Sequence, residues 1–259
     1  MNPSFALQTW VMTRRSVMGL LRQPWWIGIT LVQPVIWLLL FGALFKSVVE
    51  IPGFEAESYY DFLVPGVAIM TAVFGAGWSG MGILDDMDRG VTDRLLTSPI
   101  GRVPIVMGLL LQVVLSVWIQ ALIITGLGAI VGASYPGGVA GIVVMIVCSG
   151  LLALAIGACS SAIALLSRQE ETMIGVVTFF TLPLTFLSST FMQLSLAPDW
   201  IEQVARFNPV NWAVEASRSA VGADADWGMI LPRMGGLIVI AGLCVFWAAS
   251  AFKTYQKSI

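Results

Sequence analysis

Long apolar stretches alternate along the chain with short polar intervals. Six stretches contain no Asp, Glu, Lys, Arg or His, and each is close to or above the roughly 20 residues that a helix needs to cross a bilayer. These stretches are residues 25–45, 62–84, 104–131, 139–166, 172–192 and 234–252. The pattern predicts an all-α integral membrane protein with six transmembrane helices.

The absence of charge inside the stretches bears on mechanism. Carriers driven by ion or proton gradients usually hold carboxylates, histidines or bases in their spans, although each charge costs roughly 2.5 to 3.5 kcal/mol at the helix centre. Here no predicted span holds such a group. We therefore expect the driving force to come from outside the membrane-spanning part of the chain.

Composition supports one membrane domain. The 259 residues are 58% hydrophobic and 11% charged, which excludes a soluble or a disordered class. The longest polar intervals are residues 46–61, 85–103 and 193–228, and each is too short for an independent globular core. We therefore expect residues 1–259 to form a single transmembrane domain. The net charge of −2 belongs to loops and does not suggest a nucleic-acid partner.

The distribution of basic residues predicts the orientation. With a cytoplasmic N-terminus, nine bases lie inside and four outside, and the positive-inside rule favours that arrangement. The inner bases are Arg14, Arg15, Arg22, Arg89, Arg94, Arg102, Arg168, Lys253 and Lys257, and the outer ones are Lys46, Arg206, Arg218 and Arg233. We expect a multi-pass protein of the bacterial plasma membrane with both termini in the cytoplasm.

The chain lacks the residues of common catalytic sites. It has no histidine, so the Gly77-Trp78-Ser79-Gly80 sequence lacks the base that intramembrane serine proteases need. It also lacks a phosphate-binding loop and a zinc motif. The three cysteines all lie in predicted spans and are expected to be packing residues. The sequence predicts no enzyme, no metal site and no cofactor bound to this chain.

Two segments are predicted at the cytoplasmic face. Residues 4–21 place Phe5, Trp10, Val17 and Leu21 among polar positions, which is typical of a helix in the headgroup region. This helix could also be no more than a membrane anchor.

The second cytoplasmic segment follows the second span. Residues 84–98 have an apolar stripe at spacings of three and four, and Asp85 with Arg89 and Arg89 with Asp93 form i,i+4 pairs. We predict a cytoplasmic helix that ends near Ser98, before Pro99. The alternative is an ordinary charged connection between two spans.

Two short helices are predicted on the outer side, between the last two spans. The first, residues 199–207, places Trp200, Val204 and Phe207 on one face. The second begins at Asn208-Pro209, a good N-cap followed by proline at the first helical position. Both are too apolar for solvated loops, so we expect them at or within the outer leaflet.

These motifs resemble the membrane subunits of type 2 ABC exporters, in particular the daunorubicin-resistance permease group. The most specific stretch is residues 88–102 (DRGVTDRLLTSPIGR), similar to the family signature after the second span. Residues 208–218 (NPVNWAVEASR) are similar to the external Asn-Pro segment before the last span. The resemblance covers the whole chain. The family often has Glu where this chain has Asp85, Asp86 and Asp88.

The resemblance implies that two permease subunits, copies or paralogues, form a pathway through the lipid above two separate ATPase subunits, which bind ATP and magnesium. It implies an ATPase-coupling helix after the second span, contacts from Arg14 and Arg15 of the surface helix, and an external gate. The implied coupling residues are Asp85, Asp86, Asp88, Arg89, Gly90, Asp93, Arg94, Leu95, Leu96, Ser98, Pro99 and Arg102. The implied gate residues are Trp200, Phe207, Asn208, Pro209 and Trp212.

Large apolar side chains within the spans are candidates to line a cavity for a hydrophobic or amphipathic small molecule or lipid. They are Trp37, Phe74, Trp78, Met81, Phe180, Phe186, Phe191 and Met192. Packing against lipid or neighbouring helices is the alternative for each. Two other functions stay open: an ion-coupled secondary carrier and a non-transporting membrane scaffold.

Overall fold

The computed structural model describes residues 5–21, 24–51, 54, 56, 58–91 and 101–257. The described part of the chain is helical and contains no strand. Its elements are α1 (Phe5–Leu21), α2 (Pro24–Leu44), η1 (Lys46–Glu50), α3 (Tyr59–Gly77), α4 (Ser79–Asp88), α6 (Arg102–Val131), α7 (Gly138–Ser167), α8 (Glu170–Phe186), η2 (Leu194–Leu196), α9 (Asp199–Ala205), α10 (Pro209–Val221) and α11 (Trp227–Lys257).

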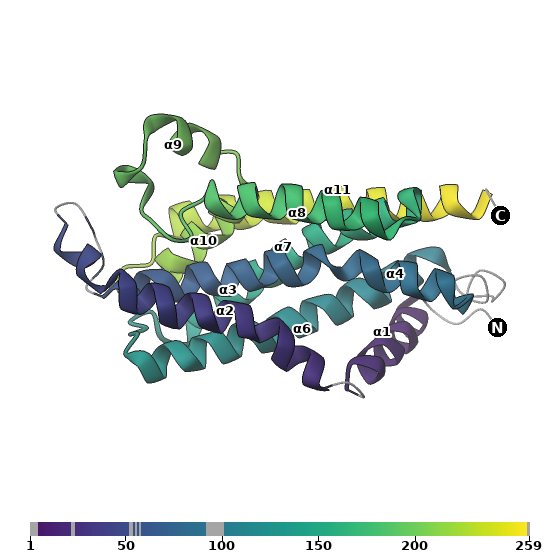
Figure 1. Cartoon of the computed structure of the whole chain (residues 1–259), viewed down its shortest axis with the longest axis horizontal. Coiled ribbons are helices and arrows are strands. Elements are labelled where there is room, and N and C mark those ends of the chain that lie inside the picture. The colour runs from purple at the N-terminus through teal and green to yellow at the C-terminus, as the bar shows by residue number, and fades with distance from the viewer. Residues whose placement is uncertain are drawn as a thin grey trace.

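The long helices lie side by side along the long axis of the molecule (Figure 1). α1, the end of α4 and the end of α11 lie together at one end, here named the terminal end. η1, α9 and α10 lie at the opposite end, here named the distal end. The chain therefore runs back and forth between two ends, as the alternation of apolar and polar segments predicts.

Four helical segments among the described residues are long and apolar enough to cross a membrane. They are Tyr59–Asp88, Val103–Val131, Gly138–Ser167 and Trp227–Tyr255. The apolar helix Gly28–Leu44 is shorter, and α8 has 17 residues. The prediction of an all-α membrane protein is confirmed, while the count of six spans stays a prediction.

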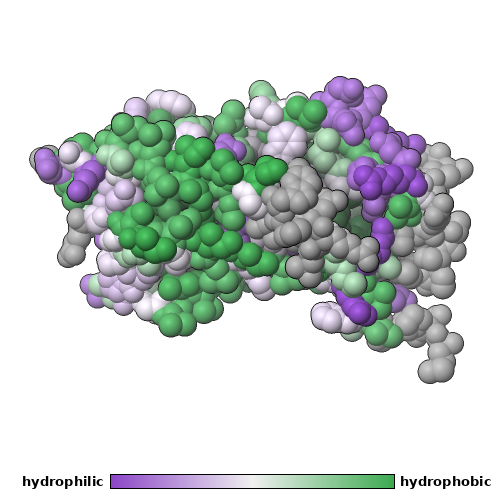
Figure 2. Space-filling model, turned by 60° about the horizontal axis from the view of Figure 1, so that its bottom comes forward, coloured by the Kyte–Doolittle hydropathy of each residue, from purple (hydrophilic) through white to green (hydrophobic). Residues whose placement is uncertain are grey.

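The outer surface of the helix bundle is apolar. Figure 2 shows a broad hydrophobic face with polar residues gathered toward the ends of the molecule. Large exposed apolar side chains occur on α2, α8 and α11, including Ile29, Val32, Ile36, Leu39, Leu40, Phe179, Phe180, Ile238, Val239, Leu243 and Phe246. In water such a surface would be unfavourable, so this face fits contact with lipid.

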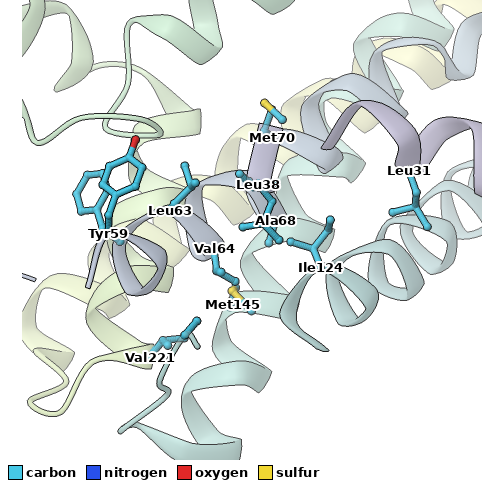
Figure 3. Close-up of a cluster of buried hydrophobic side chains, with 14 residues drawn as sticks. Leu31, Leu38, Tyr59, Leu63, Val64, Ala68, Met70, Ile124, Met145 and Val221 are labelled. Carbon is cyan, nitrogen blue, oxygen red and sulfur yellow. The ribbon is translucent and has the colours of Figure 1, made fainter. Parts of the chain in front are cut away.

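One buried cluster joins α2, α3, α6 and α7 (Figure 3). Leu38, Leu63, Ile124 and Met145 have no exposed surface within it. Small residues bring other helices together more closely. A side chain at Gly141 of α7 would collide with the carbonyl of Ala220, so α10 packs directly on the α7 backbone.

The second predicted span, residues 62–84, is divided in two. α3 ends at Gly77, Trp78 lies between the helices, and α4 begins at Ser79. The Ser160 hydroxyl of α7 donates to the Gly77 carbonyl and accepts from the Gly80 N–H, at 2.5 and 2.9 Å. The Gly77–Gly80 sequence therefore marks a join between two helices, which periodicity alone does not reveal.

The fifth predicted span, residues 172–192, is also shorter than predicted. α8 ends at Phe186, three residues after Pro183, and residues 187–193 are not helical. Proline lacks an N–H and its ring clashes with the carbonyl four residues earlier, which weakens the helix at this position. The apolar composition of the whole stretch conceals the break.

Candidate functional site

The end of α4 places an acidic group at the terminal end. Asp85 forms an ion pair with Arg89 at 2.9 Å, which confirms the first of the two predicted i,i+4 pairs. The helix then stops, because the Gly90 N–H donates to the Met87 carbonyl, only three residues earlier, and Gly90 adopts a left-handed φ of 64°. The predicted helix over residues 84–98 is therefore interrupted at Arg89–Gly90. Only glycine adopts this φ at little cost.

The structure describes only some of the other predicted coupling residues. Asp88 and Gly90 lie at the end of α4, and Asp88 is exposed. Arg102 is the first residue of α6, and only its backbone is described. Asp93, Arg94, Leu95, Leu96, Ser98 and Pro99 lie outside the described residues, so their coupling role stays a prediction.

α1 contacts both sides of the predicted coupling segment. Arg15 pairs with Asp86 at 3.6 Å, and the Gln8 side chain accepts a 2.9 Å hydrogen bond from the Gly101 N–H. Gly108 of α6 faces Met12 so closely that a side chain there would collide with it. Arg14 is exposed. The N-terminal helix is thus attached to the start and the end of the segment that joins α4 to α6.

A small cavity lies beside the Arg15–Asp86 pair, between α1, α4, α6 and α11. Its volume is about 50 Å³, whereas pockets for drug-sized ligands usually measure roughly 300 to 1,000 Å³. The cavity could hold a water molecule beside the pair but not a transported small molecule. The ion-paired side chains around it are exposed at the terminal end.

The distal end holds the predicted gate residues in two groups. Asn208 caps α10, since its side chain accepts from the Val210 N–H, and Pro209 is the first helical residue. Trp212 donates to the Arg206 carbonyl at 2.7 Å and lies against Gly236 of α11. The N-cap prediction is confirmed.

The other predicted gate residues lie on the surface. Trp200 of α9 is 58% exposed, and Phe207, two residues after the end of α9, is 83% exposed. α9 itself protrudes from the bundle at the distal end (Figure 1). Their gate role stays a prediction, and the observed position suits contact with the lipid interface.

Three of the predicted substrate-lining residues come together. The Trp37 ring lies 6.3 Å from Phe186 and 5.1 Å from Phe191, and Phe186 lies 5.4 Å from Phe191. Phe41 of α2 and Phe45, the residue after α2, extend this group, with Phe41 5.2 Å from Phe191 and 5.3 Å from Phe45. We name these five side chains the aromatic seam. It joins α2 to the distal end of α8.

The remaining lining candidates lie elsewhere. Phe74 packs against the cluster of Figure 3, and Met81 packs at the terminal end of the bundle. Trp78 is 40% exposed at the join of α3 and α4, and Phe180 contacts Phe179 on the exposed face of α8. Phe41 and Phe45 were missed, although Trp37, Phe41 and Phe45 recur every four residues, as one face of a helix requires.

Comparison with known proteins decides the family. The family model of the ABC-2 type transporter matches residues 7–221. The chain belongs to the ABC-2 type transporter family. It is the membrane-spanning permease subunit of an ABC transporter, consistent with its apolar helices.

The relatives of this permease include drug-resistance proteins. It is 26% identical over 211 residues to the daunorubicin resistance ABC transporter permease protein DrrB1 of Streptomyces coeruleorubidus, covering 80% of this chain and 74% of the relative. It is 29% identical over 216 residues to a protein named as the transport permease ycf38 of Cyanophora paradoxa, covering 83% and 74%.

A third relative extends over nearly the whole chain. The permease is 22% identical over 255 residues to a protein named as the probable doxorubicin resistance ABC transporter permease protein DrrC of Mycobacterium tuberculosis (strain CDC 1551 / Oshkosh). The match covers 98% of this chain and 90% of the relative.

Proposed function

We propose that this permease exports a hydrophobic or amphipathic small molecule, powered by separate ATPase subunits that bind its terminal end. Family membership carries the proposal, and the exposed charges of α1 and α4 support the location of the contact. The ATPase subunits, rather than the permease, bind ATP and magnesium. The permease needs no titrating group in its spans, because ATP bound to the partner can favour one of two conformations.

The proposed topology has six crossings with both termini in the cytoplasm of a bacterial cell. Each of α2, the α3–α4 pair, α6, α7, α8 and α11 runs between the two ends of the molecule (Figure 1). α8 has 17 residues, about 26 Å at 1.5 Å per residue, so residues 187–193 would complete that crossing. The nine bases that the sequence assigns to the inner side support a cytoplasmic location for the terminal end.

The proposed cargo follows from the aromatic seam and from the relatives. Two relatives carry the names of daunorubicin and doxorubicin resistance. Planar aromatic compounds stack favourably on aromatic side chains, at roughly 0.5 to 1.5 kcal/mol per pair beyond burial. Trp37, Phe41 and Phe191 are only partly buried, so a cargo dissolved in lipid could reach them. A second permease subunit would complete the pathway.

Reconstitution tests the proposal. The permease alone should show no ATP hydrolysis, whereas liposomes with the permease and its ATPase should accumulate daunorubicin when ATP is supplied. Replacing Trp37 and Phe191 by alanine should lower transport while ATPase association persists. The matched control is Phe179→Ala, which removes an exposed aromatic ring outside the seam. Transport driven by a proton or sodium gradient without ATP would support a secondary carrier instead.

Labelling tests the orientation separately. A cysteine at Ser195, exposed at the distal end, should react with an impermeant thiol reagent added to intact cells. A cysteine at Thr92 should react only after the membrane is opened. The opposite result would place the termini outside and would remove the terminal end as the ATPase contact.

A further inference from the structure

The break at the end of α8 leaves backbone groups that need partners. Residues 187–193, here named the strap, are non-helical within an apolar stretch. Backbone of this kind persists at membrane depth only where protein or water satisfies its hydrogen bonds. Ser188, Ser189 and Thr190 of the strap are all buried. The strap must therefore be held by specific contacts within the chain.

Asn208 satisfies the last carbonyls of α8. Its side-chain nitrogen donates to the Leu184 carbonyl at 2.7 Å and to the Leu187 carbonyl at 2.8 Å. Its side-chain oxygen caps α10. The single amide therefore joins the end of one helix to the start of another.

Asn211 and Arg218 of α10 hold the middle of the strap. The Asn211 side-chain oxygen accepts a 2.9 Å hydrogen bond from the Ser189 N–H. Arg218 donates to the Ser189 carbonyl at 2.8 Å and to the Phe62 carbonyl of α3 at 3.1 Å. Both backbone groups of Ser189 are thus bound by α10 side chains.

Arg218 has a specific setting. Its guanidinium lies 3.5 Å above the Phe62 ring, and among the described residues no carboxylate forms an ion pair with it. Arginine stays protonated in proteins. The cation is therefore stabilised by carbonyl oxygens and one aromatic face, which link the strap to α3.

The strap lies directly on α3. A side chain at Gly66 would collide with the Thr190 carbonyl, and the Tyr59 hydroxyl donates to the Phe191 carbonyl at 3.0 Å. These contacts set the position of Phe191, whose ring lies 5.1 Å from Trp37 and 5.2 Å from Phe41. Holding the strap therefore holds the ring that packs between Trp37, Phe41 and Phe186 in the aromatic seam.

We propose that Asn211 and Arg218 are positioning residues that latch the strap against α3, so that Phe191 stays packed against Trp37 and Phe41 in the aromatic seam. This role rests on the proposed export function, because release of the strap would open the seam toward the outer side. α10 has other attachments, including the Gly137 N–H to Val221 carbonyl hydrogen bond of 2.9 Å. The latch can therefore open while α10 stays in place.

The test uses the purified permease alone, so that its outcome does not depend on an ATPase. In a background with Cys148, Cys159 and Cys244 changed to alanine, Thr190→Cys reports the strap, since Thr190 has no exposed surface. Labelling by an impermeant thiol reagent should be slow. Asn211→Leu and Arg218→Met should each raise its rate roughly tenfold, as expected for losing one or two hydrogen bonds.

Matched variants separate the latch from general stability. Asn211→Asp keeps an oxygen acceptor for the Ser189 N–H and should restore slow labelling. Arg206→Met removes an exposed arginine just after α9 and should leave the rate unchanged. A second reporter, Ala153→Cys, is buried in α7 and should stay unreactive in every variant.

Two results would count against the latch. Unchanged labelling of Thr190→Cys in both Asn211→Leu and Arg218→Met would overturn the proposal. Equal acceleration at Ala153→Cys would also overturn it, because the two residues would then support the whole fold rather than the strap.

Addition of the ATPase and nucleotide provides a separate test of the export cycle. In the background without native cysteines and without latch substitutions, Thr190→Cys should become more reactive when ATP binding drives the exporter to its outward-open state. If the isolated permease behaves as a latch but no ATPase binds it or changes this labelling, the proposed export function fails and the latch contacts stand.

Discussion

The two ends of the molecule differ in the polar contacts that lie at the ends of their long helices. At the terminal end, Arg15–Asp86 and Asp85–Arg89 are ion pairs whose side chains are 43% to 70% exposed. At the distal end, Asn208 and Asn211 are buried and bind backbone groups of the same chain. Water screens exposed pairs, so they stabilise a fold little. Buried hydrogen bonds are costly to leave unmade.

This difference indicates what each end can do. The exposed charges of the terminal end remain accessible to a partner, whose surface can complete their electrostatic contacts. The buried polar groups of the distal end are already paired within the chain and fix the ends of α8 and α10. The difference supports the proposed ATPase contact at the terminal end and the proposed latch at the distal end.

The largest expected effect is on partner binding. Arg94→Glu should abolish most ATPase association and transport, because like charges facing each other in an interface cost several kcal/mol. Insertion should be unaffected, since the predicted coupling segment lies outside the spans. Co-purification of the ATPase with correctly inserted permease measures this.

The matched control for that change is Arg206→Glu. Arg206 directly follows α9 at the distal end, and its side chain is 69% exposed. This reversal should leave ATPase association unchanged. If Arg94→Glu binds its ATPase like the parent, the terminal end is not the electrostatic contact surface, and the comparison between the ends loses its functional meaning.

A smaller effect is expected on the stability of the distal end. Gly66→Val should destabilise the isolated permease by about 1 to 3 kcal/mol, because its side chain meets the Thr190 carbonyl and the strap must move. Thermal unfolding in detergent measures this. Gly126→Val is the control, since Gly126 of α6 has open space at its Cβ position. Equal stability of the two variants would show that the strap is not closely seated.

The smallest effect is expected at the Arg15–Asp86 pair. A double-mutant cycle with alanine at each position should give a coupling of about 0.2 to 1 kcal/mol in the isolated permease, as exposed pairs usually do. Chemical denaturation measures it. The exposed Glu202–Arg206 pair of α9 should give a similar value. A coupling above about 2 kcal/mol would mean that the terminal end is held as firmly as the distal end.

Much of the architecture was predictable because bilayer thickness imposes a simple rule on sequence. α6 and α7 begin and end within two residues of their predicted bounds. The N-cap at Asn208 was predictable for an equally local reason, since its side chain bonds a backbone N–H two residues ahead. The i,i+4 pair of Asp85 and Arg89 follows from helix geometry in the same way.

The two helix breaks that the sequence did not predict have a common physical cause. The join at Trp78 and the end of α8 at Phe186 occur within apolar stretches whose composition does not change there. Each break persists because side chains from a distant helix satisfy its backbone: Ser160 at the first, and Asn208 at the second. These partners lie 83 and 24 residues away, too far for local periodicity to indicate.

The sequence by itself determined that this protein crosses a membrane, which side holds most positive charge in the proposed topology, and that the chain carries no phosphate-binding loop. Those properties depend on composition and on neighbours along the chain. The tertiary structure alone decided that Arg218, which belongs to a polar interval in the sequence, binds the carbonyls of Phe62 and Ser189. Arg218 and Phe62 are 156 residues apart along the chain, so only folding brings them together.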